Sequence, residues 1–332
     1  MNLSCCSLII LPIAYNNMKE TLSNANFPRD SEGRVYHLGI RHGEVANRIL
    51  TVGDHARAKA IARWLDTEDE AGAPVFLNHS HRGFLTITGR YKGVPVSIMA
   101  IGMGNCMMDF FVRETRAVTT GTLAIIRFGS CGSLSANAPA GTVVVPRGGY
   151  CIRKNLEYFV KEENRLFKGP VEPYQISGVF DADKEISQIL AQELEKAMAP
   201  ISGKHGVGGV VADGLNADGC SFYSSQGRKD PAFWDDNEHV IQQSMEAHPD
   251  TVSLEMETSM LFHLAECARE PNPIRAAGCM QVFADRVSNG FIHPDTVAIL
   301  EPTVGKSCLE TLIKVQVDNE MAAEGTVWEK QK

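Results

Sequence analysis

An arginine interrupts an apolar strand in the stretch Ile125-Ile126-Arg127-Phe128-Gly129-Ser130-Cys131-Gly132-Ser133. The apolar run that leads into it is typical of a buried strand. An arginine is almost never fully buried without a partner. The two glycines let a ligand approach the backbone closely, and Ser130 adds a hydroxyl. Because open α/β sheets form their ligand crevices at strand ends, this stretch predicts either a ligand site or a buried structural ion pair.

Strand-like apolar runs alternate with helical patterns along the rest of the chain. Such alternation favours an α/β layered domain with a mixed or mostly parallel sheet. The expected strands are Ile49–Val52, Val96–Ile101, Leu123–Phe128, Thr142–Val145, Val207–Val211 and Cys279–Ala284. The expected helices are Ala56–Leu65, Met107–Thr119, Lys184–Ala197, Glu257–Arg269 and Thr303–Asp318.

The chain has no Pro/Gly/Ser-rich linker and no internal repeat. We therefore expect one domain over residues 34–325. Residues 1–33 form an Asn- and Ser-rich extension that we expect to be poorly ordered, and residues 326–332 form a C-terminal tail. The polar stretch 229–250 predicts an insertion or a helix over the site.

Composition excludes several classes of protein. The 332 residues are 44% hydrophobic and 22% charged, which is typical of globular proteins. A formal net charge of −8 argues against broad nucleic-acid binding. Nine cysteines, an odd number without a Cys-x-x-Cys pair, indicate reduced thiols in a cytoplasmic protein. No run approaches a membrane span, and the apolar N-terminus lacks the basic region of a signal peptide.

A glutamine and an arginine follow an aromatic pair in Phe222-Tyr223-Ser224-Ser225-Gln226-Gly227-Arg228. The amide of Gln226 can accept from a ring N–H and donate to a carbonyl. Arg228 is a permanently charged planar donor. In an extended segment both heads would point to one side and could reach one heterocycle, with Phe222 packed on its face. A solvated surface loop is the alternative.

A second arginine lies in the turn Gly53-Asp54-His55-Ala56-Arg57. A strand ends at Gly53, and Asp54 can cap the helix that follows. A helix N-terminus beside a free backbone N–H is a natural anion site. The alternative is a plain strand-to-helix connection with a surface arginine.

The segment His79-Ser80-His81-Arg82 contains a His-x-His pair without a third ligand of matching spacing, so we expect no metal there. Arg82 is either a site residue or a solvated one. Gly102-x-Gly104 lacks the third glycine of a dinucleotide fingerprint.

Two carboxylates flank a methionine in Glu255-Met256-Glu257, where a strand meets a helix. Carboxylates suit a vicinal diol such as that of ribose, and methionine can lie against a sugar face. Acids that satisfy a helix dipole are the alternative interpretation.

Taken together and in this order, the motifs resemble the nucleoside phosphorylases of the trimeric and hexameric class, and among them the pyrimidine-specific members. The resemblance runs from about Val35 to Ile313. It rests on Val35-Tyr36-His37-Leu38-Gly39, Gly53-Asp54 with Arg57, His81-Arg82, Gly102-Met103-Gly104, Arg127-Phe128-Gly129-Ser130-Cys131-Gly132, Gln226-Gly227-Arg228 and Glu255-Met256-Glu257.

The resemblance implies a three-layer fold, with a mixed central sheet flanked by helices, and a role for each matching residue. Phosphate would be bound by Gly53, Arg57, Arg127 and Ser130, with Arg82 supplied by a neighbouring subunit. Ribose would be bound by Met256, Glu257 and Glu255, with His37 from that neighbour. Uracil would be bound by Phe222, Gln226, Arg228 and Arg286, and the groups expected to act in catalysis are Arg228, Gln226, Arg127 and Arg286.

The implied reaction is reversible phosphorolysis of uridine, with deoxyuridine as a further candidate substrate, in pyrimidine salvage. Uracil leaves as an anion, and Gln226 and Arg228 would stabilise its charge as it develops. No organic cofactor is expected. In bacterial relatives a glutamate and a serine help to hold potassium between subunits. Gly83 and Cys106 occupy those positions here, which leaves that ion site doubtful.

Three alternatives remain at this point. A purine nucleoside phosphorylase would use Asp285 as its general acid. A nucleosidase would leave the phosphate arginines idle, and a non-catalytic relative would have lost them. Since His37 and Arg82 act across an interface in the family, a homodimer with shared sites is the minimal unit expected.

Overall fold

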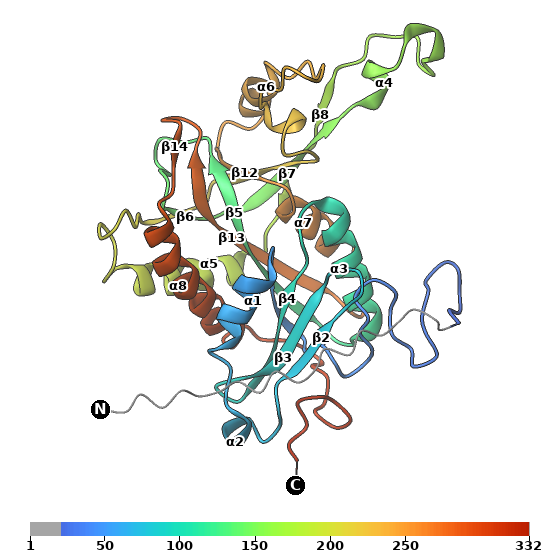
Figure 1. The fold of residues 1–332 in the computed structure, drawn as a ribbon, viewed down its shortest axis with the longest axis vertical. Coiled ribbons are helices and arrows are strands. Elements are labelled where there is room, and N and C mark those ends of the chain that lie inside the picture. The colour runs from blue at the N-terminus through green and yellow to red at the C-terminus, as the bar shows by residue number, and fades with distance from the viewer. Residues whose placement is uncertain (1–20, 332) are drawn as a thin grey trace.

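The computed structural model describes residues 21–331. A mixed β-sheet forms the middle layer, and helices cover both of its faces (Figure 1). The order of its main strands is β2-β3-β4-β1-β5-β12-β11-β7-β8, and β13 pairs with β5. The strands are β1 Arg48–Val52, β2 Phe76–His79, β3 Leu85–Tyr91, β4 Val94–Ala100, β5 Leu123–Ser133, β6 Val143–Val145, β7 Gly148–Lys154, β8 Tyr174–Ile176, β9 Phe180–Asp181, β10 Val210–Ala212, β11 Leu215–Gly219, β12 Thr251–Glu255, β13 Ile274–Asp285 and β14 Gly290–Phe291.

The helices divide into two layers. Figure 1 shows α1, α5 and α8 on one side of the sheet and α3 and α7 on the other. The short helix α4 lies at the end of a projecting arm between β7 and β8. The helices are α1 His55–Ala62, α2 Glu68–Ala71, α3 Asn105–Val118, α4 Leu156–Phe159, α5 Lys184–Met198, α6 Val240–Ala247, α7 Thr258–Glu266 and α8 Pro294–Leu312, with 3-10 turns at Glu162–Asn164 and Ser224–Gln226.

The alternation of side chains along β5 produces the two cores. Ile126 and Phe128 pack with α1, α5 and α8, whereas Leu123 and Ile125 pack with α3 and α7. Successive side chains of a strand point to opposite faces, so a strand that is apolar throughout must be covered on both sides. The α/β fold with a mixed central sheet and flanking helices is therefore confirmed.

Strand β5 occupies the centre of this sheet. It pairs in parallel with β13 along its length and with β1 over Ala124–Phe128, and antiparallel with β12 at Gly132 and Ser133. The carboxyl half of β5 thus lies beside the end of β1 at Phe128, the end of β13 at Ser133 and the last residues of β12. Arg127 and Ser130 lie on this part of β5, and Glu255 ends β12 beside it.

Two predicted elements were misplaced. Helix α8 begins at Pro294, nine residues before the expected start at Thr303, and runs through Pro302. Proline lacks the N–H that a helix interior uses, yet Pro302 is accommodated inside this helix. Strand β10 begins at Val210, whereas Val207 lies in a turn closed by its N–H to the Lys204 carbonyl oxygen.

Both ends of the described chain pack against the domain. In the region assigned to the N-terminal extension, the Arg29 side chain donates to the carbonyl oxygen of Ala117 at 2.9 Å. In the region assigned to the tail, Trp328 is buried beside Ala46 and Met321. Residues 1–20, with Cys5 and Cys6, lie outside the described residues. In residues 21–331 no helix combines the length and apolar character needed to cross a membrane.

Candidate active site

A buried ion pair between Arg127 and Glu257 lies at the centre of the candidate site. Nη2 of Arg127 donates to Oε2 of Glu257 at 2.9 Å, and Oε1 of Glu257 accepts the Gly104 N–H at 2.5 Å. Burial raises the pKa of Glu257, but the Arg127 charge and the Gly104 N–H outweigh burial and lower it. Nε of Arg127 is buried and makes no hydrogen bond in residues 21–331. The arginine interrupting the strand is thus an ion-pair member that still has a free donor.

Glu255 organises the first turn of α7 behind this pair. Its two oxygens accept the backbone N–H groups of Glu257 and Thr258, and Oε1 also accepts from Asn216 Nδ2 at 2.7 Å. Burial and the neighbouring charge of Glu257 raise the pKa of Glu255 to about 7. Asp218 accepts the next backbone N–H of the turn, from Ser259, at 3.0 Å. These contacts fix the direction of Glu257.

Arg57, in the first turn of α1 just after β1, lies beside Ser130 on β5. Asp54 caps α1 by accepting the Arg57 N–H at 2.9 Å, as expected. The Arg57 guanidinium lies 4.9 Å from the centre of the Phe128 ring, and its Nη2 donates to Ser130 Oγ at 3.1 Å. Nε and Nη2 of Arg57 also bind Glu301, from α8, at 3.0 and 2.8 Å.

Gly53, directly after the end of β1, lies close to the guanidinium of Arg127. A Cβ atom on Gly53 would lie 4.0 Å from Nη2 of Arg127, so the end of β1 runs beside that guanidinium. Gly53, Arg57, Arg127 and Ser130 therefore surround one region with two cations and a hydroxyl. Such a set of donors is suited to an anion.

Four residues expected around the base also come together. Arg228 lies over the Phe222 ring at 3.8 Å and donates to Gln226 Oε1. Arg286 donates to the Gln226 carbonyl oxygen at 2.9 Å. Burial and the nearby Arg286 lower the pKa of Arg228 to about 10. The subsite is thus electropositive and short of counter-ions.

The expectation of an extended segment at residues 222–228 was wrong. Ser224–Gln226 form a 3-10 turn, and Gly227 follows in the left-handed region with φ 62°. A Cβ at Gly227 would also meet the Ile241 side chain at 3.0 Å. Both the left-handed backbone and this close approach therefore favour glycine. The tight turn, rather than alternation along a strand, brings Gln226 and Arg228 together.

The anion and base subsites are linked through β12. Nε2 of Gln226 donates to the Glu255 carbonyl oxygen at 3.5 Å, and Met256 and Glu257 follow directly. Met256 lies against Gly104, because its Cε would be 4.0 Å from a Cβ atom placed on that glycine. A sugar between the two subsites would therefore meet Met256 and Glu257.

His37 and Arg82 belong to a different surface. His37 stacks on Phe110 at 3.9 Å and its Nδ1 lies 2.6 Å from Glu114 Oε1. Arg82 is exposed and donates to the Tyr36 hydroxyl. With Phe84 and Met107 these residues line a hollow of about 320 Å³. Within residues 21–331 no hydrogen bond or ion pair connects His37 or Arg82 to Arg57, Arg127 or Glu257.

Asp285, the alternative general acid, is engaged in its own turn. It accepts from the backbone N–H groups of Val287 and Ser288 and from the Ser288 hydroxyl. The Ser288 hydrogen bonds lower its pKa. This carboxyl is thereby kept ionised, the opposite of what a proton donor needs.

Across residues 21–331, no group of three or more His, Cys, Asp or Glu side chains is arranged to bind a metal. His79 packs edge-on against His55 instead, with ring centres 4.8 Å apart. At the positions of the implied potassium ligands, Gly83 has open space around its Cα and Cys106 is exposed.

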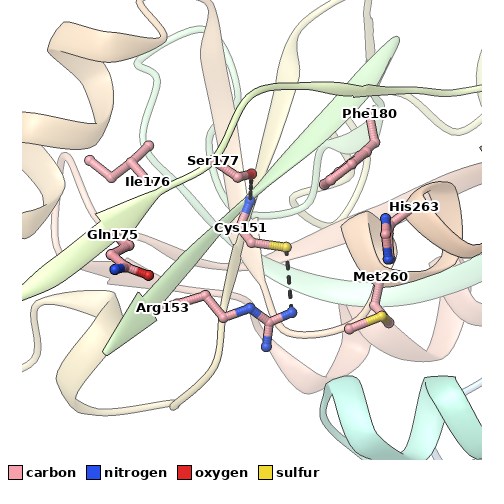
Figure 2. A pocket seen from close by; sticks show the side chains of 8 residues that line it. All are labelled: Cys151, Arg153, Gln175, Ile176, Ser177, Phe180, Met260 and His263. Carbon is pink, nitrogen blue, oxygen red and sulfur yellow. Dashed lines mark hydrogen bonds between the residues drawn. The ribbon is translucent and has the colours of Figure 1, made fainter. Parts of the chain in front are cut away.

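A separate pocket of about 350 Å³ lies between β7 and α7 (Figure 2). Cys151 and Arg153 enter it from β7, Met260 and His263 from α7, and Phe180 lies near its rim. The Cys151 N–H donates to Ser177 Oγ at 2.9 Å. Burial raises the pKa of Cys151 to about 11, so its thiol stays protonated and unreactive.

Comparison with known proteins identifies the family. A family model described as the phosphorylase superfamily matches residues 47–296. The chain belongs to the phosphorylase superfamily. The resemblance found in the sequence motifs is thereby confirmed at the level of the family.

Individual members of the superfamily show the same relationship. A uridine phosphorylase of Thermococcus kodakarensis is 28% identical over 280 residues, covering 82% of this chain and 86% of the relative. A structure from work on two uridine phosphorylases of Phytophthora capsici is 38% identical, with a TM-score of 0.82, and covers 89% of this chain and 100% of that one. A DeoD-type purine nucleoside phosphorylase of Oceanobacillus iheyensis matches only 34% of this chain and 45% of its own length.

A Trypanosoma brucei nucleoside phosphorylase shares the superfamily fold at 20% identity and a TM-score of 0.69.

Sequence reasoning missed Glu301, Gln281 and Asn216, which hydrogen-bond to residues of the site or to one another behind it. Glu301 was hidden because the helix that carries it was started too late. Pro294 at the first helical position and Asp295 after it are N-terminal signals that could have revealed this helix.

Proposed function

We propose that this protein catalyses the reversible phosphorolysis of uridine to uracil and ribose 1-phosphate, with 2′-deoxyuridine as a further substrate. The observation that carries this proposal is the Gln226–Arg228–Arg286 cluster at the base subsite. It presents amide and guanidinium donors and contains no carboxyl able to protonate a purine ring. The uridine phosphorylases named above, which match most of the chain, support the same assignment.

Phosphate would bind to Gly53, Arg57, Arg127 and Ser130. The Ser130 hydroxyl, whose oxygen accepts from Arg57, still has a proton to donate to an oxyanion. Met256 would lie under the sugar, and Glu257 would accept from its diol while paired with Arg127. Glu255 would act as a positioning residue, because the first turn of α7 and Asn216 occupy its carboxylate.

The reaction follows from these positions. Breaking the N-glycosidic bond gives the sugar cationic character and the base anionic character. Phosphate beneath the anomeric carbon stabilises the cation while it attacks. Arg228 and Gln226 donate to uracil more strongly as its charge grows, so they stabilise the transition state more than the ground state. Removal of one such donor costs roughly 2.7–4 kcal/mol in comparable sites.

The active site would be completed by a second subunit. His37 and Arg82 lie on an exposed surface of this chain and are not connected to its own anion subsite. In a homodimer each chain would supply them to its neighbour. No organic cofactor is proposed, and the seven cysteines in residues 21–331, all free, support a cytoplasmic location.

The test is ultraviolet-monitored turnover of uridine and inosine, each with and without phosphate. We expect loss of uridine only when phosphate is present, and no change in inosine. Asp285→Asn serves as a control, and it should leave uridine turnover nearly intact. Cleavage of inosine that Asp285→Asn abolishes would instead support the purine alternative, and cleavage of uridine without phosphate would support a nucleosidase.

A further inference from the structure

A carboxylate lies beside the proposed anion subsite. Oε1 of Glu301 accepts from Arg57 Nε at 3.0 Å, from Arg57 Nη2 at 2.8 Å and from Gln281 Nε2 at 3.3 Å. Oε2 makes no hydrogen bond in residues 21–331, and the side chain is 26% exposed. One oxygen of Glu301 therefore orients Arg57, and the other is left as an open acceptor.

The geometry places this acceptor next to the groups that would bind phosphate. Nη2 of Arg57 is shared between Glu301 and the Ser130 hydroxyl, so a single guanidinium separates the carboxylate from that hydroxyl. Nη1 of Arg57 has no hydrogen-bond partner in the described part of the chain and remains available to an anion. A carboxylate here repels any anion that cannot donate a hydrogen bond to it.

We propose that Glu301 makes the anion subsite selective for protonated oxyanions. Oε2 accepts a hydrogen bond from the hydroxyl group of hydrogen phosphate. Sulfate has the same shape but carries no proton at neutral pH, so its oxygen would meet the carboxylate oxygen without a hydrogen between them. This inference rests on the proposed function, because it treats phosphate as the substrate of this site.

Binding measurements on the full chain test this without any nucleoside. Phosphate, arsenate and sulfate are titrated separately by calorimetry at neutral pH. Arsenate resembles phosphate in shape and carries a proton, so we expect it to bind about as tightly as phosphate. We expect sulfate to bind on the order of 100-fold more weakly, as a hydrogen bond to a charged group is replaced by repulsion.

The substitution Glu301→Gln should reverse this preference. An amide can donate to sulfate, so sulfate affinity should rise about 10-fold or more while phosphate affinity falls. Glu310→Gln is the matched control. It removes a carboxylate from the same helix, bonded to Tyr91 and Lys92, and should leave the phosphate-to-sulfate ratio unchanged.

Two results would overturn the proposal. Equal binding of phosphate and sulfate by the unmodified protein contradicts it, whether or not the variant folds. An equal loss of affinity for all three anions in Glu301→Gln shows that Glu301 only positions Arg57. A preserved preference for phosphate over sulfate, with no turnover of uridine, would instead count against the proposed function alone.

Discussion

The two parts of the proposed active site differ in how they are built. Arg127 and Glu257 are 3% and 5% exposed, and the surrounding strands supply partners for most of their polar atoms. Arg82 and His37 lie on the surface, and their contacts are with Tyr36, Phe110 and Glu114. The buried part is arranged by one chain. The exposed part would be completed only by the second chain that we propose.

The difference between the buried and the exposed residues shows which interactions a single chain can organise. Desolvated charges need fixed partners, because burial without them is strongly unfavourable. They therefore lie where several strand ends meet. Arg82 and His37, which we propose to reach a neighbouring chain, would have to remain accessible, and they lie on a loop and beside Phe110 of α3.

The largest effect is expected from Glu257→Gln, which disrupts the buried ion pair between Arg127 and Glu257. It removes the charge that pairs with Arg127 and replaces one of the two accepting oxygens of Glu257 with a donor. We expect kcat/KM for uridine to fall on the order of 10⁴-fold, because buried polar groups lose their partners, and stability to fall by about 3–5 kcal/mol.

Steady-state kinetics and urea unfolding measure the two effects of Glu257→Gln separately. Uridine and 2′-deoxyuridine should also become more alike as substrates, since the group proposed to contact the diol is lost. Full activity in a folded Glu257→Gln protein would contradict the role given to this residue.

Substitution at the base subsite should have the next largest effect. Arg228→Met keeps much of the side chain that covers Phe222 but removes the donor to uracil. We expect kcat to fall about 10²- to 10³-fold with a smaller change in KM, since the interaction strengthens in the transition state. A change confined to KM would show that Arg228 binds the ground state only.

Arg82→Ala should have a smaller effect, because the side chain is exposed in a single chain and contributes only one of several phosphate donors. We expect KM for phosphate to rise about 10- to 100-fold. The same assays with varied phosphate check this, and Arg147→Ala, which removes another exposed ion-paired arginine, serves as the control. An unchanged phosphate KM would remove Arg82 from the site.

The smallest expected effect concerns pH and Glu255. Its pKa is raised in the folded chain to about 7 from 4.5, so the folded state binds a proton that the unfolded state releases. This contribution to stability is complete below pH 4.5 and is lost as pH rises to about 7. Glu255→Gln should flatten the pH dependence of stability in that window, as followed by urea unfolding. An unaltered profile would show that Glu255 keeps an ordinary pKa.

Sequence patterns predicted the layers of this fold well where elements are long and apolar. β5 was found because it begins as an unbroken apolar run, and α5 because its buried residues recur every four positions. The short strand β11 escaped because it contains Asn216 and Asp218, polar residues whose partners come from distant parts of the chain. Propensity cannot detect a strand that tertiary contacts specify.

The candidate site was predicted residue by residue, but its supports were not. Motif order indicated Arg127, Glu257, Gln226 and Arg228. The residues behind them, such as Glu301, depend on how α8 lies across the sheet, which no local pattern encodes. The turn at Gly227 was also misread, because a left-handed glycine and an extended segment have the same short-range composition.

Mixing two impaired variants, assayed with phosphate at the KM of the unmodified protein so that Arg82→Ala is nearly inactive, tests the shared-site claim most directly. Arg82→Ala and Glu257→Gln are co-expressed with different tags, and the mixed dimers are isolated by two affinity steps. In each mixed dimer one site combines an intact Glu257 with the partner's intact Arg82, while the other site lacks both. The account predicts that mixed dimers recover about half of the unmodified activity per dimer, with normal KM for phosphate. Activity equal to the average of the two parent variants would contradict it, and would place Arg82 with the site of its own chain or outside the site altogether.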